Sequence, residues 1–433
     1  MTGKDRWGSI AIFLLMFGIR LGVVLSTGSY QVSDDVESNR AAVSVAERGV
    51  LGNIFYADSG PSAHLSPVHP LLLGGIYRVW GSETPAALLV QSLVAIGCVS
   101  LMAASFPFLA RRAGLPPGAG WLAAALLALL PFQFYVETTG TWEQAEVALA
   151  LVLLLWMFIS IHDRKWADRR TGLLLGLLIG GLALLSPVLL AVAGLLLLAE
   201  AVAHRDCRGR VLAHGALSLA VAVVIIAPWA YRNRVALGAT VWTRSNFGLE
   251  FYVGNNDEAS GATPLVGDGN SFLHRHHPFA SQEEQSRMRA VGELPYMREK
   301  LMLAFDWVQA HPGRFGTLVV KRAQLYWFTG LEQREPKDRW RIPKFLLYVG
   351  LGLGAICGLA VLFVQRHPCR WLFLACMLGP GVPYLMTHVS LRYRYPLYPL
   401  TLLMTSVALV QAFHVARRRF WSSSASLPSA PPP

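Results

Sequence analysis

Charged residues are scarce in this sequence. Asp, Glu, Lys and Arg make up 15% of the 433 residues, hydrophobic residues make up 54%, and the mean hydropathy is +0.42. A water-soluble protein of this length needs far more charge on its surface, so the composition excludes an ordinary soluble globule. The aliphatic and aromatic content also excludes a disordered chain.

Cysteine is also rare, with 5 residues in the chain, which excludes a disulfide-braced scaffold. Cys98, Cys357 and Cys376 lie in apolar runs, where cysteine acts as a small hydrophobic side chain. Cys207 and Cys369 fall in short basic loops, and none of the spacings matches a metal site. We therefore expect no disulfide, no metal centre and no cofactor.

Long apolar runs dominate the sequence. A helix that crosses a bilayer needs about 20 mostly apolar residues. Ten such windows occur, at 8–27, 86–109, 118–137, 143–161, 172–187, 188–203, 211–229, 345–365, 370–388 and 395–416. The uncharged run 171–199 holds two helices if it turns at Ser186 and Pro187. The sequence thus predicts an all-α polytopic membrane protein with about ten transmembrane helices.

The net charge of +12 would suggest nucleic-acid binding in a soluble protein, but here the basic residues border the predicted spans, so no nucleic-acid partner is expected. Basic residues mark cytoplasmic loops. With ten spans, five basic clusters share that side, at 111–112, 164–170, 205–210, 366–370 and 417–419. Two large segments, 28–85 and 230–342, and a short one at 388–397 then lie outside. We expect amphipathic helices within 281–311 and a disordered tail at 421–433.

Acidic residues follow the first predicted span, in the sequence SDDVES. Ser33 is a candidate N-cap that would place Asp34, Asp35 and Glu37 in the first turn of a helix, where acidic residues are favourable. The same carboxylates are also candidates for a general base beside a binding group. Both interpretations fit the sequence alone.

Other polar groups of the outer segments allow two interpretations each. His64 and His69 lie in a loop punctuated by prolines, and neither they nor the histidines of HRHHPF at 274–279 have zinc-ligand spacing. Arg392 and Arg394 either reach the membrane interface beside tyrosines or bind phosphate. Arg20, inside the first apolar helix, either holds the acidic loop or reaches the outer interface.

A series of motifs in a fixed order resembles the glycosyltransferase C superfamily, and within it bacterial enzymes related to protein O-mannosyltransferases and lipid A aminoarabinose transferases. The motifs are the acidic pair, an AxxxAxxG-like segment (Ala42, Ala46, Gly49), LLLGGIYRVWG at 71–81, APWAYRNRVALGATVWTRSNFGLEFYVGNNDEASG at 227–261, AHPGRFGTLVVKRAQLYWF at 310–328 and RYRYPLYPL at 392–400. The chain departs from the family pattern at Asp35 and Ser38, where the family commonly has Glu and Tyr, and at Asp257, where it often has Pro.

The resemblance implies a single domain over residues 1–420 that moves a sugar from a polyprenyl-phosphate donor to an acceptor hydroxyl with inversion. It implies that Asp34 is the catalytic base and that Asp35 orients the acceptor or tunes Asp34. The expected phosphate-binding residues are Arg232, Arg392 and Arg394, with Arg244 as a further candidate. The expected acceptor- or sugar-binding residues are His64, His69, Glu143 and Asn255.

The partners implied by the resemblance are a lipid-linked sugar, an acceptor that is a glycan, a lipid or a protein, and membrane lipids. The implied location is the bacterial inner membrane, with the site facing the periplasm. A transporter or lipid flippase is the alternative, but such proteins often have repeated halves around a midplane site. This chain instead concentrates its polar groups in unequal outer segments. A noncatalytic assembly or binding protein, the third alternative, would tolerate replacement of the acidic pair.

Overall fold

The computed structural model describes residues 3–424 apart from 57, 131–133, 169, 265–270 and 331–338. Within these residues the regular structure is helical, and β pairing is limited to two isolated bridges, Gly52–Pro61 and Ala262–Val389. This confirms the predicted all-α class. An all-helical chain suits a membrane because each helix satisfies its own backbone hydrogen bonds.

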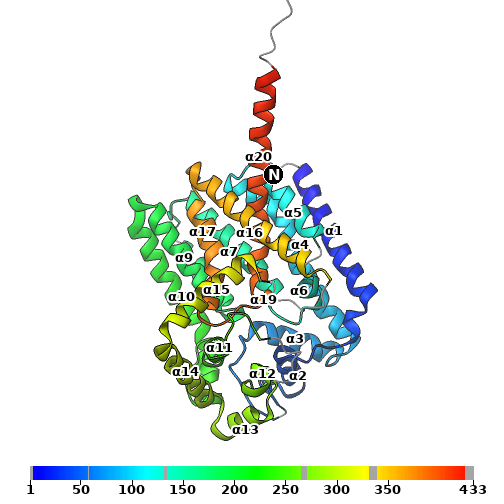
Figure 1. The fold of residues 1–433 in the computed structure, drawn as a ribbon, viewed down its shortest axis with the longest axis vertical. Helices are drawn as coiled ribbons and strands as arrows, with labels where there is room; N and C mark the ends of the chain where they lie inside the picture. Colours follow the sequence, from blue (N-terminus) through cyan, green and yellow to red (C-terminus); the bar gives the residue numbers. More distant parts are fainter. Residues whose placement is uncertain are drawn as a thin grey trace, which may run out of the picture.

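Long apolar helices form the upper bundle in Figure 1. Among the described residues, six are long and apolar enough to cross a membrane: α1 (Gly3–Thr27), α4 (Pro85–Ala113), α7 (Gln144–Asp163), α10 (Arg208–Leu237), α16 (Arg341–Val364) and α20 (Tyr398–Ser424). Three shorter apolar helices join them: α5 (Ala119–Leu129), α8 (Thr171–Leu185) and α9 (Val188–Ala203). The chain is therefore a multi-pass membrane protein.

The ten predicted spans correspond to these helices with two differences. The window 118–137 is not one helix, because α5 ends at Leu129 and a separate short helix, α6, occupies Phe134–Thr139. The window 370–388 is broken into α17 (Arg370–Leu378), a short 3₁₀ turn (Gly379–Gly381) and α18 (Val382–Met386). Proline has no backbone N–H to continue a helix, which explains a break at a Gly-Pro-Gly sequence. The predicted turn at Ser186 and Pro187 is confirmed, since α8 ends and α9 begins there.

The basic loops meet at one end of the bundle. Arg112 pairs with Asp163 at 3.0 Å, Lys165 lies 3.9 Å from Asp206, and the Nε2 atom of His367 lies 3.3 Å from the carbonyl oxygen of Gly114. These contacts join the loops that follow α4, α7, α9 and α16. We call this the basic end. The predicted tail begins inside α20, which continues to Ser424, and residues 425–433 lie outside the described part of the chain.

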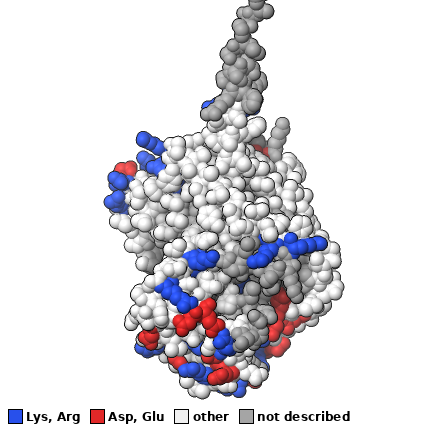
Figure 2. Space-filling view, viewed as in Figure 1, with Lys and Arg blue, Asp and Glu red and all other residues white. Residues whose placement is uncertain are grey.

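The two large polar segments fold together at the opposite end, the polar end. Their helices are α2 (Glu37–Arg48), α3 (Val68–Trp80), α11 (Phe247–Gly254), α12 (Phe272–His276), α13 (Gln282–Val291), α14 (Glu293–Ala310) and α15 (Pro312–Phe328). Ile54, Phe55, Leu249 and Met297 share one buried cluster. Charged side chains gather at this end, whereas the bundle is mostly uncharged on the face drawn in Figure 2.

Candidate functional site

Asp34 lies in the polar-end loop that precedes α2. Its Oδ2 atom accepts hydrogen bonds from the Tyr135 hydroxyl at 3.1 Å and the Thr141 hydroxyl at 3.0 Å. The Asn39 side-chain amide donates to the Asp34 backbone carbonyl at 3.0 Å. Within the described residues the second carboxylate oxygen, Oδ1, has no hydrogen-bond partner. Among the described residues, Asp34 is therefore held through one carboxylate oxygen.

Glu37 lies in the first turn of α2, as the N-cap interpretation predicts, but Asp34 and Asp35 do not. Helix α2 begins at Glu37, with Val36 as its N-cap residue, so the prediction that Ser33 caps a helix containing Asp34 and Asp35 is wrong. Ser33 instead donates a hydrogen bond to Glu83 across the loop. Asp34 and Asp35 therefore lie in a loop, and their side chains bind different partners.

Asp35 is turned away from the hydroxyls that hold Asp34. Its two carboxylate oxygens accept hydrogen bonds from Arg40 at 2.6 and 2.7 Å, and its side chain is 73% exposed. These hydrogen bonds hold the pKa of Asp35 below its ordinary value. Arg40 also donates to the backbone carbonyl of Phe55 at 2.8 Å. The Asp35–Arg40 pair thus fastens the loop to the neighbouring segment.

Arg392 supplies positive charge next to the Asp34 site. Its guanidinium lies 3.8 Å from the ring centroid of Trp142, and its charge acts on the hydroxyl of Tyr135, the residue that binds Asp34. Among the described residues no carboxylate lies within ion-pair distance of Arg392. Arg394 points elsewhere, donating to the backbone carbonyl of Trp327 at 3.2 Å. Of these two arginines, the geometry therefore favours Arg392 for an anion.

Three consecutive residues connect this site to a neighbouring cavity. Thr141 binds Asp34, Trp142 stacks with Arg392, and Glu143 accepts a hydrogen bond from Arg244. The cavity has a volume of about 240 Å³, and Glu143, Arg244, Glu250, Tyr384, Thr387 and Tyr393 are among the residues that line it. Tyr393 follows Arg392 in the chain, so the segments 141–143 and 392–393 border both the Asp34 site and this cavity.

His69 and Glu250 brace the walls of these two spaces. The Nε2 atom of His69 lies 3.3 Å from the Thr141 carbonyl oxygen, and its Nδ1 atom lies 3.2 Å from Glu146. Glu250 lies 2.7 Å from the Nε2 atom of His388. Although burial opposes ionisation of Glu250, the hydrogen bond and the charge of His388 lower the pKa of Glu250 to about 2.

Three predicted site residues lie away from Asp34 and take part in packing. Arg232 donates to the backbone carbonyls of residues 51 and 62 at 2.7 and 2.9 Å. His64 is buried at an edge-to-face contact with Phe55, and this burial lowers the pKa of His64 to about 3. Asn255 donates to the backbone carbonyls of residues 251 and 386. The histidines of HRHHPF also have separate neighbours, with His274 against Ser271 and His277 accepting from the backbone N–H of Phe279.

The tyrosine, threonine and tryptophan around Asp34 were not selected from the sequence. Tyr135, Thr141 and Trp142 are uncharged residues that follow Asp34 in the chain only after four intervening helices, α2, α3, α4 and α5. A sequence signal does exist in the run of polar residues ETTGTWE between two apolar windows. It indicates a polar loop, but it does not indicate which carboxylate that loop meets.

The Arg20 side chain selected from the first helix supports the site from inside the bundle. It is fully buried, pairs with Glu137 at 2.8 Å and donates to the backbone carbonyl of Leu127 at 2.7 Å. Glu137 also accepts a hydrogen bond from the Tyr395 hydroxyl at 2.8 Å. Arg20 therefore does not reach the outer interface, and it joins α1 to the segments that carry Tyr135 and Arg392.

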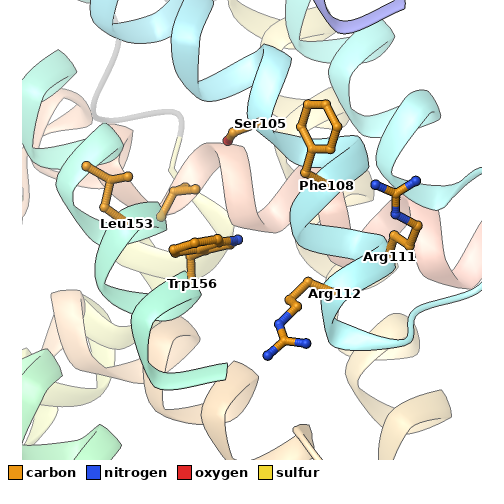
Figure 3. Close-up of a pocket in the computed structure, with 7 residues that line it drawn as sticks. Ser105, Phe108, Arg111, Arg112, Leu153 and Trp156 are labelled. Atoms are coloured by element: carbon orange, nitrogen blue, oxygen red, sulfur yellow. The ribbon is translucent and has the colours of Figure 1, made fainter. Parts of the chain in front are cut away.

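A cavity of about 650 Å³ opens at the basic end and is drawn in Figure 3. Phe108 and Trp156 form apolar walls, and Arg111 and Arg112 stand at its border. Both arginines are engaged in ion pairs, with Asp5 and Asp163. The cavity lies at the other end of the bundle from Asp34, so it is separate from the candidate site.

Comparisons with known proteins give a likeness in structure. No protein-family model and no curated protein sequence matches the chain. The structure is similar to the archaeal oligosaccharyltransferase AglB from Archaeoglobus fulgidus, solved with an inhibitory peptide and a dolichol-phosphate: 12% of residues are identical, the match covers 99% of this chain and 53% of that one, and the TM-score is 0.53. The apo form of the A. fulgidus enzyme matches with 12% identity, 98% and 53% coverage and a TM-score of 0.54.

A third structure of the A. fulgidus oligosaccharyltransferase, tethered to an acceptor peptide containing the NVT sequon, matches with 12% identity, 95% and 50% coverage and a TM-score of 0.55. The chain thus spans about half the length of the structures it resembles. At this identity the likeness establishes the fold. This chain therefore shares its all-α fold with these oligosaccharyltransferases.

Proposed function

We propose that this protein is a membrane glycosyltransferase that moves a sugar from a polyprenyl-phosphate donor to an acceptor hydroxyl at the polar end. The observation that carries the proposal is the Asp34 carboxylate, held through one oxygen by Tyr135 and Thr141 while the other oxygen has no partner among the described residues, beside the half-buried Arg392. The fold adds support, because a protein that shares it was solved with a dolichol-phosphate.

Asp34 is the general base in this proposal. Its Oδ1 atom accepts the proton of the acceptor hydroxyl as that oxygen attacks the anomeric carbon from the face opposite the lipid phosphate. The new glycosidic C–O bond forms, the bond from the anomeric carbon to the phosphate oxygen breaks, and the lipid phosphate leaves with the bonding electron pair. Tyr135 and Thr141 donate hydrogen bonds to Oδ2 and fix the direction of the carboxylate.

Arg392 binds the departing phosphate. A guanidinium can donate two parallel hydrogen bonds to phosphate oxygens, and the Trp142 ring keeps its plane oriented. A fixed positive charge stabilises the developing charge of the leaving group. Arg232 and Arg394, which bind backbone carbonyls, stabilise the surrounding segments in this proposal.

The sugar occupies the cavity lined by Glu143 and Arg244, next to the Trp142 wall. His69 contributes by holding the Thr141 carbonyl, while His64 and Asn255 maintain the packing of the polar end. Asp35 orients the loop through Arg40 and does not contact the acceptor. Each of these assignments can be tested by substituting the residue concerned.

We further propose that residues 1–420 act as one domain in a bacterial inner membrane. The basic end then faces the cytoplasm, following the rule that positive charges remain inside. The Asp34 site faces the periplasm, where a glycan, a lipid or a protein supplies the acceptor hydroxyl.

The test is transfer of radiolabelled sugar from a panel of polyprenyl-phosphate sugars to membrane extracts. Purified wild-type protein and a folded Asp34→Asn variant are compared in the same lipid. We expect transfer from at least one donor by the wild-type protein and loss of it in the variant. Equal transfer by both proteins rejects Asp34 as the base, and no transfer from any donor favours a transporter or flippase.

A further inference from the structure

Two histidines and a glutamate converge at the basic end, away from the proposed catalytic site. His162 lies in the last turn of α7, Glu200 in the last turn of α9, and His204 directly after α9. The Nδ1 atom of His162 lies 2.7 Å from Oε1 of Glu200 and 3.1 Å from Nε2 of His204. That Nε2 atom lies 3.5 Å from Oε2 of Glu200. All three side chains are buried.

Hydrogen bonds alone fit these contacts poorly. If only His162 carries a proton here, on Nδ1, that single proton must serve both Glu200 and His204. If both nitrogens carry protons and donate to Glu200, two N–H groups face each other 3.1 Å apart. If His204 donates to His162 instead, the lone pair of Nδ1 faces the carboxylate at 2.7 Å. A cation at the centre uses the lone pairs of all three groups together. It also compensates the charge of Glu200, which is 0% exposed and pairs with no lysine or arginine within the described part of the chain.

The spacing matches a small metal ion. Zinc bonds to imidazole nitrogen and carboxylate oxygen are about 2.0–2.2 Å long, so the ligand atoms of a tetrahedral site lie about 3.3 Å apart. The Nδ1 atom of His162 lies 3.1 Å from Nε2 of His204 and 2.7 Å from Oε1 of Glu200, and that Nε2 atom lies 3.5 Å from the other carboxylate oxygen, so these separations lie around that spacing. One ligand atom from each residue lies within 4.8 Å of those of the other two. The loop after His204 also brings Asp206 and Cys207 within 4.8 Å of a ligand atom of that histidine, which offers candidates for a fourth ligand.

A neighbouring side chain orients Glu200 through a hydrogen bond, as is usual for residues that bind a metal ion. The fully buried Trp166 donates its indole N–H to Oε2 of Glu200 at 2.6 Å. To place this ring, Lys165 and Trp166 both adopt positive φ angles, 48° and 58°, which are uncommon for long or bulky residues. Metal-binding groups are commonly oriented by such outer hydrogen bonds, whose loss weakens metal affinity roughly 10–100-fold.

We propose that His162, Glu200 and His204 bind a divalent transition metal ion, of which Zn²⁺ best suits this donor set. The site joins the cytoplasmic ends proposed for α7 and α9. Because it is buried and lies at the opposite end from Asp34, its role is structural. It is independent of the proposed transferase activity.

The experiment uses the full-length protein in detergent, stripped of metal with a chelator. Zn²⁺ is then titrated in competition with a chromophoric chelator, and Co²⁺ is bound separately to read its coordination geometry from the visible spectrum. We expect one equivalent of Zn²⁺ and an intense tetrahedral Co²⁺ spectrum. Glu200→Gln and His204→Gln should weaken Zn²⁺ binding by at least about 100-fold, and Trp166→Phe by roughly 10–100-fold.

His214→Gln is the matched control, because the ring of His214 lies 6.0 Å from that of Trp166 but does not join the cluster. It should bind Zn²⁺ as the wild-type protein does. If the wild-type protein binds Zn²⁺ no better than Glu200→Gln, or gives only a weak octahedral Co²⁺ spectrum, the three residues form a hydrogen-bonded cluster and the proposal is overturned. If the variants fail to fold, the wild-type stoichiometry and Co²⁺ spectrum still decide.

Asp34→Asn should retain Zn²⁺ binding, since it lies at the other end of the bundle. Loss of transfer in that variant with intact Zn²⁺ binding would support both proposals. A wild-type protein that binds Zn²⁺ but transfers no sugar would leave the metal site supported and reject the transferase, so the two proposals fail separately.

Discussion

Replacing Asp34 by asparagine removes the proposed base while conserving its shape. The asparagine carbonyl oxygen can accept the same two hydrogen bonds, from Tyr135 at 3.1 Å and from Thr141 at 3.0 Å. The amide nitrogen then takes the place of Oδ1 and cannot accept a proton. Because the hydrogen bonds remain and lose only the charge of their acceptor, the free energy of unfolding should change by about 1 kcal/mol or less.

The expected loss is therefore in rate. A positioned general base contributes roughly 10²–10⁴-fold, which corresponds to about 2.7–5.4 kcal/mol of activation free energy. At saturating lipid-linked donor, the kcat for transfer should fall by that factor in Asp34→Asn, while the KM for the donor changes little. The assay is the initial rate of radiolabel transfer in one lipid mixture, with the folded fraction measured by size-exclusion chromatography.

Asp35→Asn is the matched comparison, because it makes the same chemical change one residue along the chain. Asp35 is 73% exposed and pairs with Arg40, and a surface ion pair contributes about 0–1 kcal/mol. Its effect on kcat should therefore stay below roughly tenfold by the same relation between free energy and rate. Equal losses in the two variants would refute the reasoning, because they would mean that the neighbouring carboxylates act as a unit despite their separate partners.

Three further substitutions test other parts of the site. Arg392→Lys removes the planar fork stacked on Trp142 and should lower kcat/KM for the donor by about 10- to 100-fold, as expected for a charged hydrogen bond; an unchanged kcat/KM would exclude Arg392 from phosphate binding. Glu137→Gln leaves Arg20 as a buried uncompensated charge and should cost about 3–5 kcal/mol, which thermal unfolding in detergent would detect as a lowered Tm; an unchanged Tm would contradict this. His64 has a folded-state pKa of about 3, below the ordinary value near 6.5, so as the pH falls the unfolded chain takes up the proton first. The free energy of unfolding therefore decreases by up to about 1.4 kcal/mol per pH unit as the pH falls from about 6.5 to about 3. His64→Phe should flatten the dependence of Tm on pH across that window, and a slope equal to that of the wild-type protein would contradict the assignment.

The membrane helices could be predicted well because their signal is local. An apolar run long enough to cross a bilayer is visible without knowledge of its neighbours, and the Ser186–Pro187 turn follows from the length of one such run. The boundaries that were missed depend on packing. Added side-chain atoms at Gly379 would meet Val192 on α9, and at Gly381 they would meet Trp327, so close approach of other segments accompanies the break in the window 370–388.

The candidate site could be predicted in part for the same reason. Asp34 was selected because acidic residues after the first span are visible in the sequence, but its partners Tyr135 and Thr141 are 101 and 107 residues away. Asp35 was grouped with Asp34 because they are adjacent. Its partner Arg40 is five residues further on. The capping interpretation starts the helix at residue 34, whereas α2 begins at Glu37. In the loop before α2 the two carboxylates can point in different directions, which a helical turn starting at residue 34 does not predict.

The buried Arg20–Glu137–Tyr395 contact gives the two halves of the proposed site a common support. Glu137 lies two residues after Tyr135, which orients the base, and Tyr395 lies three residues after Arg392, which faces the phosphate. Burying an arginine and a carboxylate is costly, and an apolar pair of similar size would often be at least as stable. An apolar pair would not fix the direction of its neighbours, however. The Arg20 guanidinium also donates to the backbone carbonyls of Leu127 and Ala128 and so orients the groups that it binds. In the proposed mechanism, the position of Asp34 relative to Arg392 is thus fixed from inside the bundle, by residues that touch neither substrate.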